Sequence, residues 1–104
     1  MEIRNKINTL ETLTLTELQG YECNDLKTVR TEQEIDKLCK SIRKHGFSMP
    51  IFISKKHNYI LDGTGRWQAI HKLVAEGYEF KEIPVLDIEA RDKSHCKELT
   101  LALS

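Results

Sequence analysis

The segment LDGTGRWQAI, residues 61–70, constrains the fold most, because it changes from a strand pattern to a helix pattern within a few residues. An apolar run at 59–61 leads into it, and apolar residues at helical spacing continue to about residue 76. Glycine tolerates positive φ and lets another group approach the backbone. A helix that begins just after such a loop presents free N–H groups and the positive end of its dipole, which favours an anion such as phosphate. The same glycines are also ordinary turn residues, so the local sequence leaves both interpretations open.

The residues beside these glycines carry the candidate chemistry. Arg66 falls in the expected first helical turn, where a guanidinium can bind phosphate oxygens through two hydrogen bonds. Asp62 precedes the loop, where it could bind Mg²⁺, act as a base toward a hydroxyl or cap the helix, and the sequence does not choose between these roles. For Trp67, packing is favoured over stacking on a nucleobase.

Charge and cysteine content exclude several classes of protein. The 104 residues suit one domain, and 16 basic residues cancel 16 acidic ones, which argues against strong non-specific binding to nucleic acid. Cys23, Cys39 and Cys96 contain no Cys-x-x-Cys pair and indicate free thiols in a reducing compartment. The four histidines are too scattered to predict a zinc site. No signal peptide or membrane-length apolar run is present, so we expect a cytoplasmic protein with no membrane partner.

The other elements follow from periodicity and turn residues. Thr31 and Glu34 have capping-box spacing and predict a helix over 31–45 that ends at Gly46. Strands are expected at 12–15, 50–53, 59–61 and 83–86, the middle two forming a hairpin; a loose arm is expected at 1–10 and a loop at 19–25. The positions expected to be mostly buried are Ile35, Leu38, Ile42, Ile51, Ile53, Ile60, Ile70, Leu73, Val74 and Val85.

A last helix is expected at about 91–103, with Cys96, Leu99 and Leu103 on one face. The pattern stops without a terminating residue. We therefore expect this helix either to be an interface, with a homodimer as one form, or to begin a further region of a longer protein.

Three segments in this order, SIRKHGFSMPI, DGTGRWQA and EIPVLDI, closely resemble the ParB/sulfiredoxin superfamily. The chain looks most like the small ParB-like N-terminal domains of phages, plasmids and other mobile elements, which are often labelled ParB-like nuclease domains. The resemblance covers about residues 12–90. It implies an α+β fold, a small mixed sheet with helices packed on it, with residues 1–104 forming a single domain.

The resemblance also implies a ligand site. In the family, the box that here reads Gly63, Thr64, Gly65 and Arg66 holds nucleotide phosphates at a helix start. The box from Gly46 through Pro50 to Ile51 borders the same pocket. Similar partition proteins use cytidine triphosphate with Mg²⁺, together with a further nucleotide-binding box and a helix-turn-helix domain that this sequence does not show.

Two other branches of the superfamily are weaker matches. Sulfiredoxins carry a catalytic cysteine where this chain has Thr64, so sulfinate reduction is not expected, since a hydroxyl cannot form the sulfur intermediate. Free-serine kinases match Asp62, Gly63 and Arg66 but have two histidines between them. No cluster of carboxylates supports a two-metal nuclease.

The function expected from the sequence is therefore a nucleotide-binding module in the DNA metabolism of a mobile element. Its expected partners are a nucleoside triphosphate, with Mg²⁺ as an option at Asp62, and DNA or a DNA-processing protein. The alternatives are a phosphotransferase or nucleotide hydrolase that uses Asp62, and a degenerate scaffold that keeps only the fold.

Overall fold

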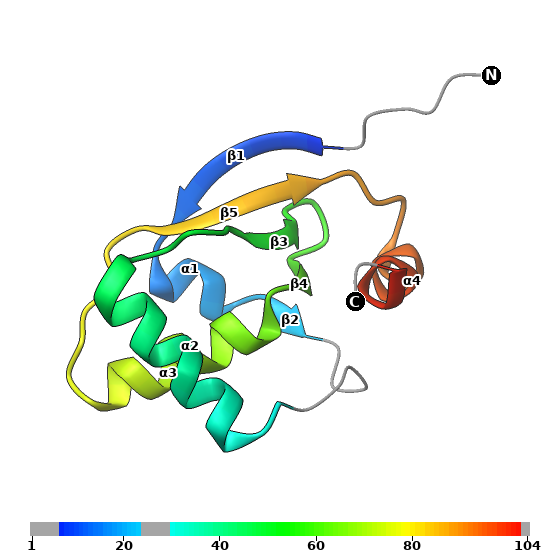
Figure 1. Ribbon diagram of the computed structural model, residues 1–104. Helices are drawn as coiled ribbons and strands as arrows, with labels where there is room; N and C mark the ends of the chain where they lie inside the picture. The colour runs from blue at the N-terminus through cyan, green and yellow to red at the C-terminus, as the bar shows by residue number, and fades with distance from the viewer. Residues whose placement is uncertain (1–6, 24–29, 103–104) are drawn as a thin grey trace.

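The computed structural model describes residues 7–23 and 30–102 and contains one five-stranded sheet and four helices in the described part (Figure 1). In chain order the elements are β1 (Ile7–Leu13), α1 (Leu15–Gln19), β2 (Glu22–Cys23), α2 (Glu32–His45), β3 (Ile51–Ser54), β4 (Tyr59–Asp62), α3 (Thr64–Ala75), β5 (Ile83–Ile88) and α4 (Lys93–Ala102). This is the expected α+β fold.

The sheet is mixed, as expected, with the strand order β1-β5-β3-β4-β2. The β1–β5 and β3–β4 pairs are antiparallel, and the second of these is the expected hairpin. The β3–β5 and β2–β4 pairs are parallel. Strands β3 and β5, which share the centre with β4, therefore run side by side, and the helix after β4 starts near the middle of the sheet (Figure 1).

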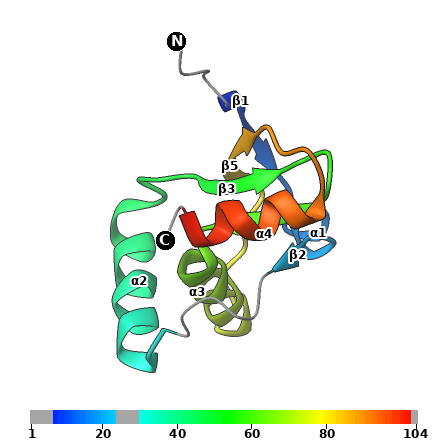
Figure 2. The same cartoon turned by 90° about the vertical axis from the view of Figure 1, so that its right-hand side faces the viewer.

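The two faces of the sheet are covered by different helices. Successive strand residues point to opposite faces. Ile60 of β4 packs in the cluster that contains Trp67 and Ile70 of α3, whereas its neighbours Tyr59 and Leu61 pack with Cys96 of α4. Helix α2 lies outside α3 and packs on it through Ile35 and Cys39, against Ala69 and Leu73. Figure 2 shows α4 crossing the molecule apart from α2, which stands beside α3.

Helix α2 confirms the expected capping box. The Glu34 N–H donates to the Thr31 side chain, and the Glu34 carboxylate accepts from the Thr31 N–H. Gly46 ends the helix as expected, with φ 72° and ψ −161°, a positive φ outside the left-handed helical region. The residues buried as expected are Ile35, Ile51, Ile53, Ile60, Ile70, Leu73 and Val85. Leu38, Ile42 and Val74 are only partly buried, because they lie at the margins of their clusters.

The N-terminal third differs from expectation. Residues 7–10 belong to β1 instead of a loose arm, and β1 ends at Leu13, since Thr14 caps α1. The first part of β1 is missed because Ile7–Leu10 are exposed and this part of the strand is held by backbone pairing to β5 rather than by an apolar face. The loop expected at 19–25 contains β2, a two-residue strand too short for any period. Residues 1–6 and 24–29 lie outside the described part.

Helix α4 forms within the range expected for the last helix. Cys96 is fully buried, Leu99 is partly buried, and Leu101 is exposed on the outer face; Leu103 lies outside the described residues. A homodimer through α4 stays a prediction. Among the helices in residues 7–23 and 30–102, none is long and apolar enough to cross a lipid bilayer.

Candidate functional site

The turn from β4 into α3 is as abrupt as the sequence indicates. Asp62 is the last residue of β4, Gly63 is the N-cap, and Thr64 begins the helix. Gly63 has φ 93° and ψ 21°, a left-handed conformation that side chains other than glycine rarely adopt. Capping of α3 by Asp62 is therefore wrong: the N-cap is Gly63, and no side chain caps the helix from that position.

The first turn of α3 has backbone donors that the helix itself does not use. The Trp67 N–H donates to the Gly63 carbonyl at 2.9 Å, which is the first bond of the helical ladder. The N–H groups of residues 64–66 precede this bond and have no acceptor within the helix. They lie at the positive end of the helix dipole. The turn can therefore accept an anion.

Arg66 projects from this turn back across Gly63. One of its terminal nitrogens, Nη2, lies 3.2 Å from the position that a Gly63 Cβ would occupy and donates to the Pro50 carbonyl at 3.3 Å. Its Nε is buried and has no hydrogen-bond partner in the described part of the chain. A guanidinium has several N–H donors, and one long hydrogen bond uses only one of them. The hydrogen bond to the Pro50 carbonyl thus holds Arg66 against the backbone of the 46–50 segment.

A pocket of about 170 Å³ lies beside Arg66. It is lined by Leu38, Ser41, Ile42, Gly46, Phe47, Ser48, Met49 and Arg66. Gly46 and Arg66 come from the two sequence boxes, so the fold brings these boxes to one cavity. Pro50 contributes its carbonyl to Arg66, whereas Ile51 is buried and its Cα lies 3.4 Å from the Gly63 Cβ position. Thr64 and Gly65 lie on the helix start next to this pocket, outside its lining.

Arg30 also reaches this helix start, and sequence reasoning missed it. Gly65 is buried, and a Cβ on it would lie 2.1 Å from Nε of Arg30. The Nη1 of Arg30 lies 3.6 Å from the Glu34 carboxylate, and the two side chains are about half exposed. No local spacing joins residues 30 and 65. Only the packing of α2 on α3 brings them together.

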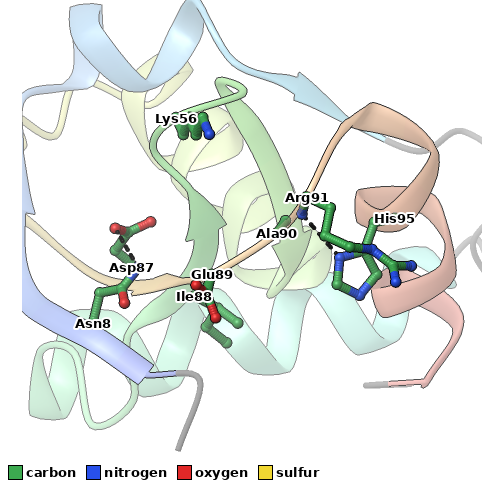
Figure 3. A pocket seen from close by; sticks show the side chains of 8 residues that line it. All are labelled: Asn8, Lys56, Asp87, Ile88, Glu89, Ala90, Arg91 and His95. Carbon is green, nitrogen blue, oxygen red and sulfur yellow. Dashed lines mark hydrogen bonds between the residues drawn. The ribbon is translucent and has the colours of Figure 1, made fainter.

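A larger cavity lies elsewhere. It measures about 530 Å³ and is formed where β1 and β5 approach the start of α4; its lining is Asn8, Lys56, Asp87, Ile88, Glu89, Ala90, Arg91 and His95 (Figure 3). Asp87 already accepts hydrogen bonds from Asn8 and from the Lys55 N–H, and the Arg91 N–H donates to His95. Both signs of charge line the cavity, so its chemistry selects no class of ligand.

The remaining reactive groups lie away from the loop. None of the three cysteines forms a disulfide within the described residues; Cys39 and Cys96 are buried, and burial raises the pKa of both. Trp67 is buried in the core with its ring centroid 4.2 Å from that of His71, which confirms packing as its role. Within residues 7–23 and 30–102, no group of three histidine, cysteine, aspartate or glutamate side chains could hold a metal ion.

Comparison with known proteins decides the family. The family model described as the ParB N-terminal domain matches residues 1–101. The chain belongs to this family. No curated protein matches the chain significantly. Solved structures that share the fold of this ParB N-terminal domain include two that are described next.

The first is a Pnob8-like ParB-N domain, with a TM-score of 0.62 and 18% identity over 97% of this chain. The second is the C-terminally truncated chromosome-partitioning protein ParB from Caulobacter crescentus complexed with CTP-γ-S, with a TM-score of 0.65 and 21% identity over 92% of this chain. This ParB N-terminal domain spans 39% and 52% of those two solved chains.

Proposed function

We propose that this ParB N-terminal domain binds a nucleoside triphosphate at the start of α3 and acts in the DNA metabolism of a mobile element. The observation that carries the proposal is the position of Arg66. It comes from the first turn of α3, is held by the Pro50 carbonyl and lines the pocket with Gly46. Arg66 therefore joins the 63–66 box to the 46–51 box in one site.

The phosphates fit the helix start. Gly63 turns the backbone in a left-handed conformation, and the N–H groups of residues 64–66 have no acceptor within the helix. A phosphate there can accept from these N–H groups and from the donors of Arg66, and such charge-assisted bonds are the strong ones. When Mg²⁺ accompanies the triphosphate, it neutralises phosphate charge, and Asp62 is the carboxylate adjoining the loop that would hold it.

The small pocket fits the other end of the ligand. Its volume of about 170 Å³ is below the range of roughly 300–1,000 Å³ typical of whole small-molecule sites. Leu38, Ile42, Phe47 and Met49 give it apolar walls, and two serines add polar atoms. We therefore assign the base to this pocket and the phosphates to the helix start. The Caulobacter crescentus neighbour, solved with a CTP analogue, makes CTP the first nucleotide to test.

The DNA partner is proposed more broadly. With 16 basic and 16 acidic residues, the chain has no net charge that would give strong non-specific affinity for DNA. We therefore propose that DNA contact, where it occurs, is local or runs through a DNA-processing protein. A cytoplasmic location remains the expectation from the sequence.

Calorimetric titration with CTP, UTP, ATP and GTP, each with Mg²⁺, tests the proposal. Arg66→Ala removes the charge-assisted contact, worth about 1.5–3 kcal/mol, and should lower affinity about ten- to a hundredfold. Arg66→Lys should recover only part of the loss, because an ammonium lacks the planar fork. Arg91→Ala, an exposed arginine at the distant cavity, is the matched control and should bind like the wild type.

Absence of binding by the wild type to all four nucleotides would reject the proposal, as would equal affinity in a folded Arg66→Ala variant. Chromatography of the incubated nucleotide then separates binding from turnover. Formation of nucleoside diphosphate that is abolished in Asp62→Asn would favour the alternative, in which Asp62 acts in a phosphotransferase or a nucleotide hydrolase.

A further inference from the structure

We infer that Arg30 is a second phosphate-binding cation of this site. We also infer that position 65 is glycine because any side chain there would displace Arg30. The inference rests on the proposed function, since the phosphate is the one assigned to the start of α3. It concerns a residue outside both sequence boxes, on the segment that leads into α2.

The backbone does not require glycine at position 65. Gly65 is the second residue of α3 and, unlike Gly63, has no positive φ. Glycine is a poor helix former, so its presence inside a helix needs another reason. Space supplies that reason: a Cβ at this position would lie 2.1 Å from Nε, 2.4 Å from Cδ and 3.1 Å from Cζ of Arg30. Arg30 and a side chain at position 65 cannot occupy the same place.

The position of Arg30 is set by the start of α2. One oxygen of Glu34, Oε1, accepts from the N–H and hydroxyl of Thr31 in the capping box, which fixes the carboxylate. The other oxygen, Oε2, lies 3.6 Å from Nη1 of Arg30. The cap thus directs the Arg30 side chain across the start of α3 while leaving about half of it exposed to solvent.

The positive charge gathered at the start of α3 favours an anionic ligand there. A helix N-terminus carries partial positive charge and disfavours nearby cations. Here two guanidinium groups approach one helix N-terminus from separate elements, Arg66 from within α3 and Arg30 from the segment before α2. The ion pair of Arg30 with Glu34 is half exposed, so it contributes little. A phosphate accepts several hydrogen bonds and would stabilise both cations and the free N–H groups together.

A double-mutant cycle tests the inference with CTP plus Mg²⁺ and, separately, with inorganic triphosphate as probes. Arg30→Ala should lower affinity for both probes by about three- to tenfold, less than Arg66→Ala, because the side chain is half exposed. Gly65→Ala should cause a similar loss by displacing Arg30. The double variant should bind no more weakly than Arg30→Ala, since the displaced cation is already absent.

Arg43→Ala is the matched control. Arg43 lies on α2 and its Nη1 is 3.5 Å from the Glu76 carboxylate, so it has the same kind of ion pair at the opposite end of α3. Its loss should change affinity by less than about twofold. Thermal unfolding without ligand gives a second readout: Gly65→Ala should raise the melting temperature more in the Arg30→Ala background than in the wild type, because the overlap with Arg30 is gone.

The outcomes separate the two claims. If the wild type binds the probes and Arg30→Ala binds them equally well, Arg30 is not a phosphate ligand, while nucleotide binding stands. If Arg30→Ala and Gly65→Ala weaken binding additively, Gly65 provides space for the ligand itself and does not act by making room for Arg30. If the wild type binds neither probe, the proposed function and this inference both fail.

Discussion

Replacing Gly63 by alanine separates backbone strain from ligand contact, because the chain contains a matched glycine. Gly63 has φ 93° and Gly77 has φ 101°, so an L-residue is strained at both. A Cβ at Gly77 would have no atom within 4 Å, whereas one at Gly63 would lie 3.2 Å from Nη2 of Arg66 and 3.4 Å from Cα of Ile51. The two substitutions therefore share one cost and differ in another.

The shared cost can be estimated from the dihedral angles. A left-handed conformation costs an L-residue about 1–2 kcal/mol. Removing glycine also restricts the unfolded chain, which returns about 0.4–1 kcal/mol. Each variant should therefore lose about 1 kcal/mol of unfolding free energy, and its melting temperature should fall by about 4–8 °C. Urea and thermal denaturation of the two variants measure this directly.

The difference should appear in binding. The Ile51 backbone cannot move easily, so in Gly63→Ala the guanidinium of Arg66 must shift from the Pro50 carbonyl. We expect nucleotide affinity to fall by up to about tenfold in Gly63→Ala and to stay at the wild-type level in Gly77→Ala. Equal affinities in the two variants would show that the position of Arg66 over Gly63 does not matter for binding. Unchanged stability in both would contradict the strain estimate.

Three further predictions concern stability and reactivity. Thr31→Ala should remove the cap of α2 and cost about 0.5–2 kcal/mol in urea denaturation, whereas Thr31→Asp should keep most of it. Alkylation followed by mass spectrometry should modify the partly buried Cys23 before Cys96, because burial raises the pKa of Cys96; faster labelling of Cys96 would contradict its burial. The hydrogen bond from Lys55 lowers the pKa of Glu11 below its ordinary 4.5, so its small contribution is present above that value and is lost as pH falls through the lowered pKa. Glu11→Gln should flatten the acid limb of the stability curve, and an unchanged limb would argue against this pair.

The sequence predicts those elements that carry a local signal, such as a capping residue, an apolar period or a turn glycine. Helix α2 carries a capping box and an apolar face, and β4 carries an apolar run that ends at glycines; both form where expected. Strand β1 carries no such signal, because its exposed first half depends on a partner strand more than seventy residues away along the chain. The same limit applies to the site. Arg66 belongs to a local box, whereas Arg30 reaches Gly65 only through tertiary packing and has no pattern in the sequence.

The pairing of β1 with β5 has a consequence for the order of assembly. Ile7 lies opposite Ile88, so the first and last strands of the described residues pair with each other, although most of the described chain lies between them. Closing so long a stretch of chain is entropically costly and is expected late in folding. Until then, β5 is one edge of the sheet and β1 is an unpaired strand, and open strand edges can pair with other chains. Association of nascent or refolding chains should therefore begin at this side of the sheet, opposite the edge formed by β2.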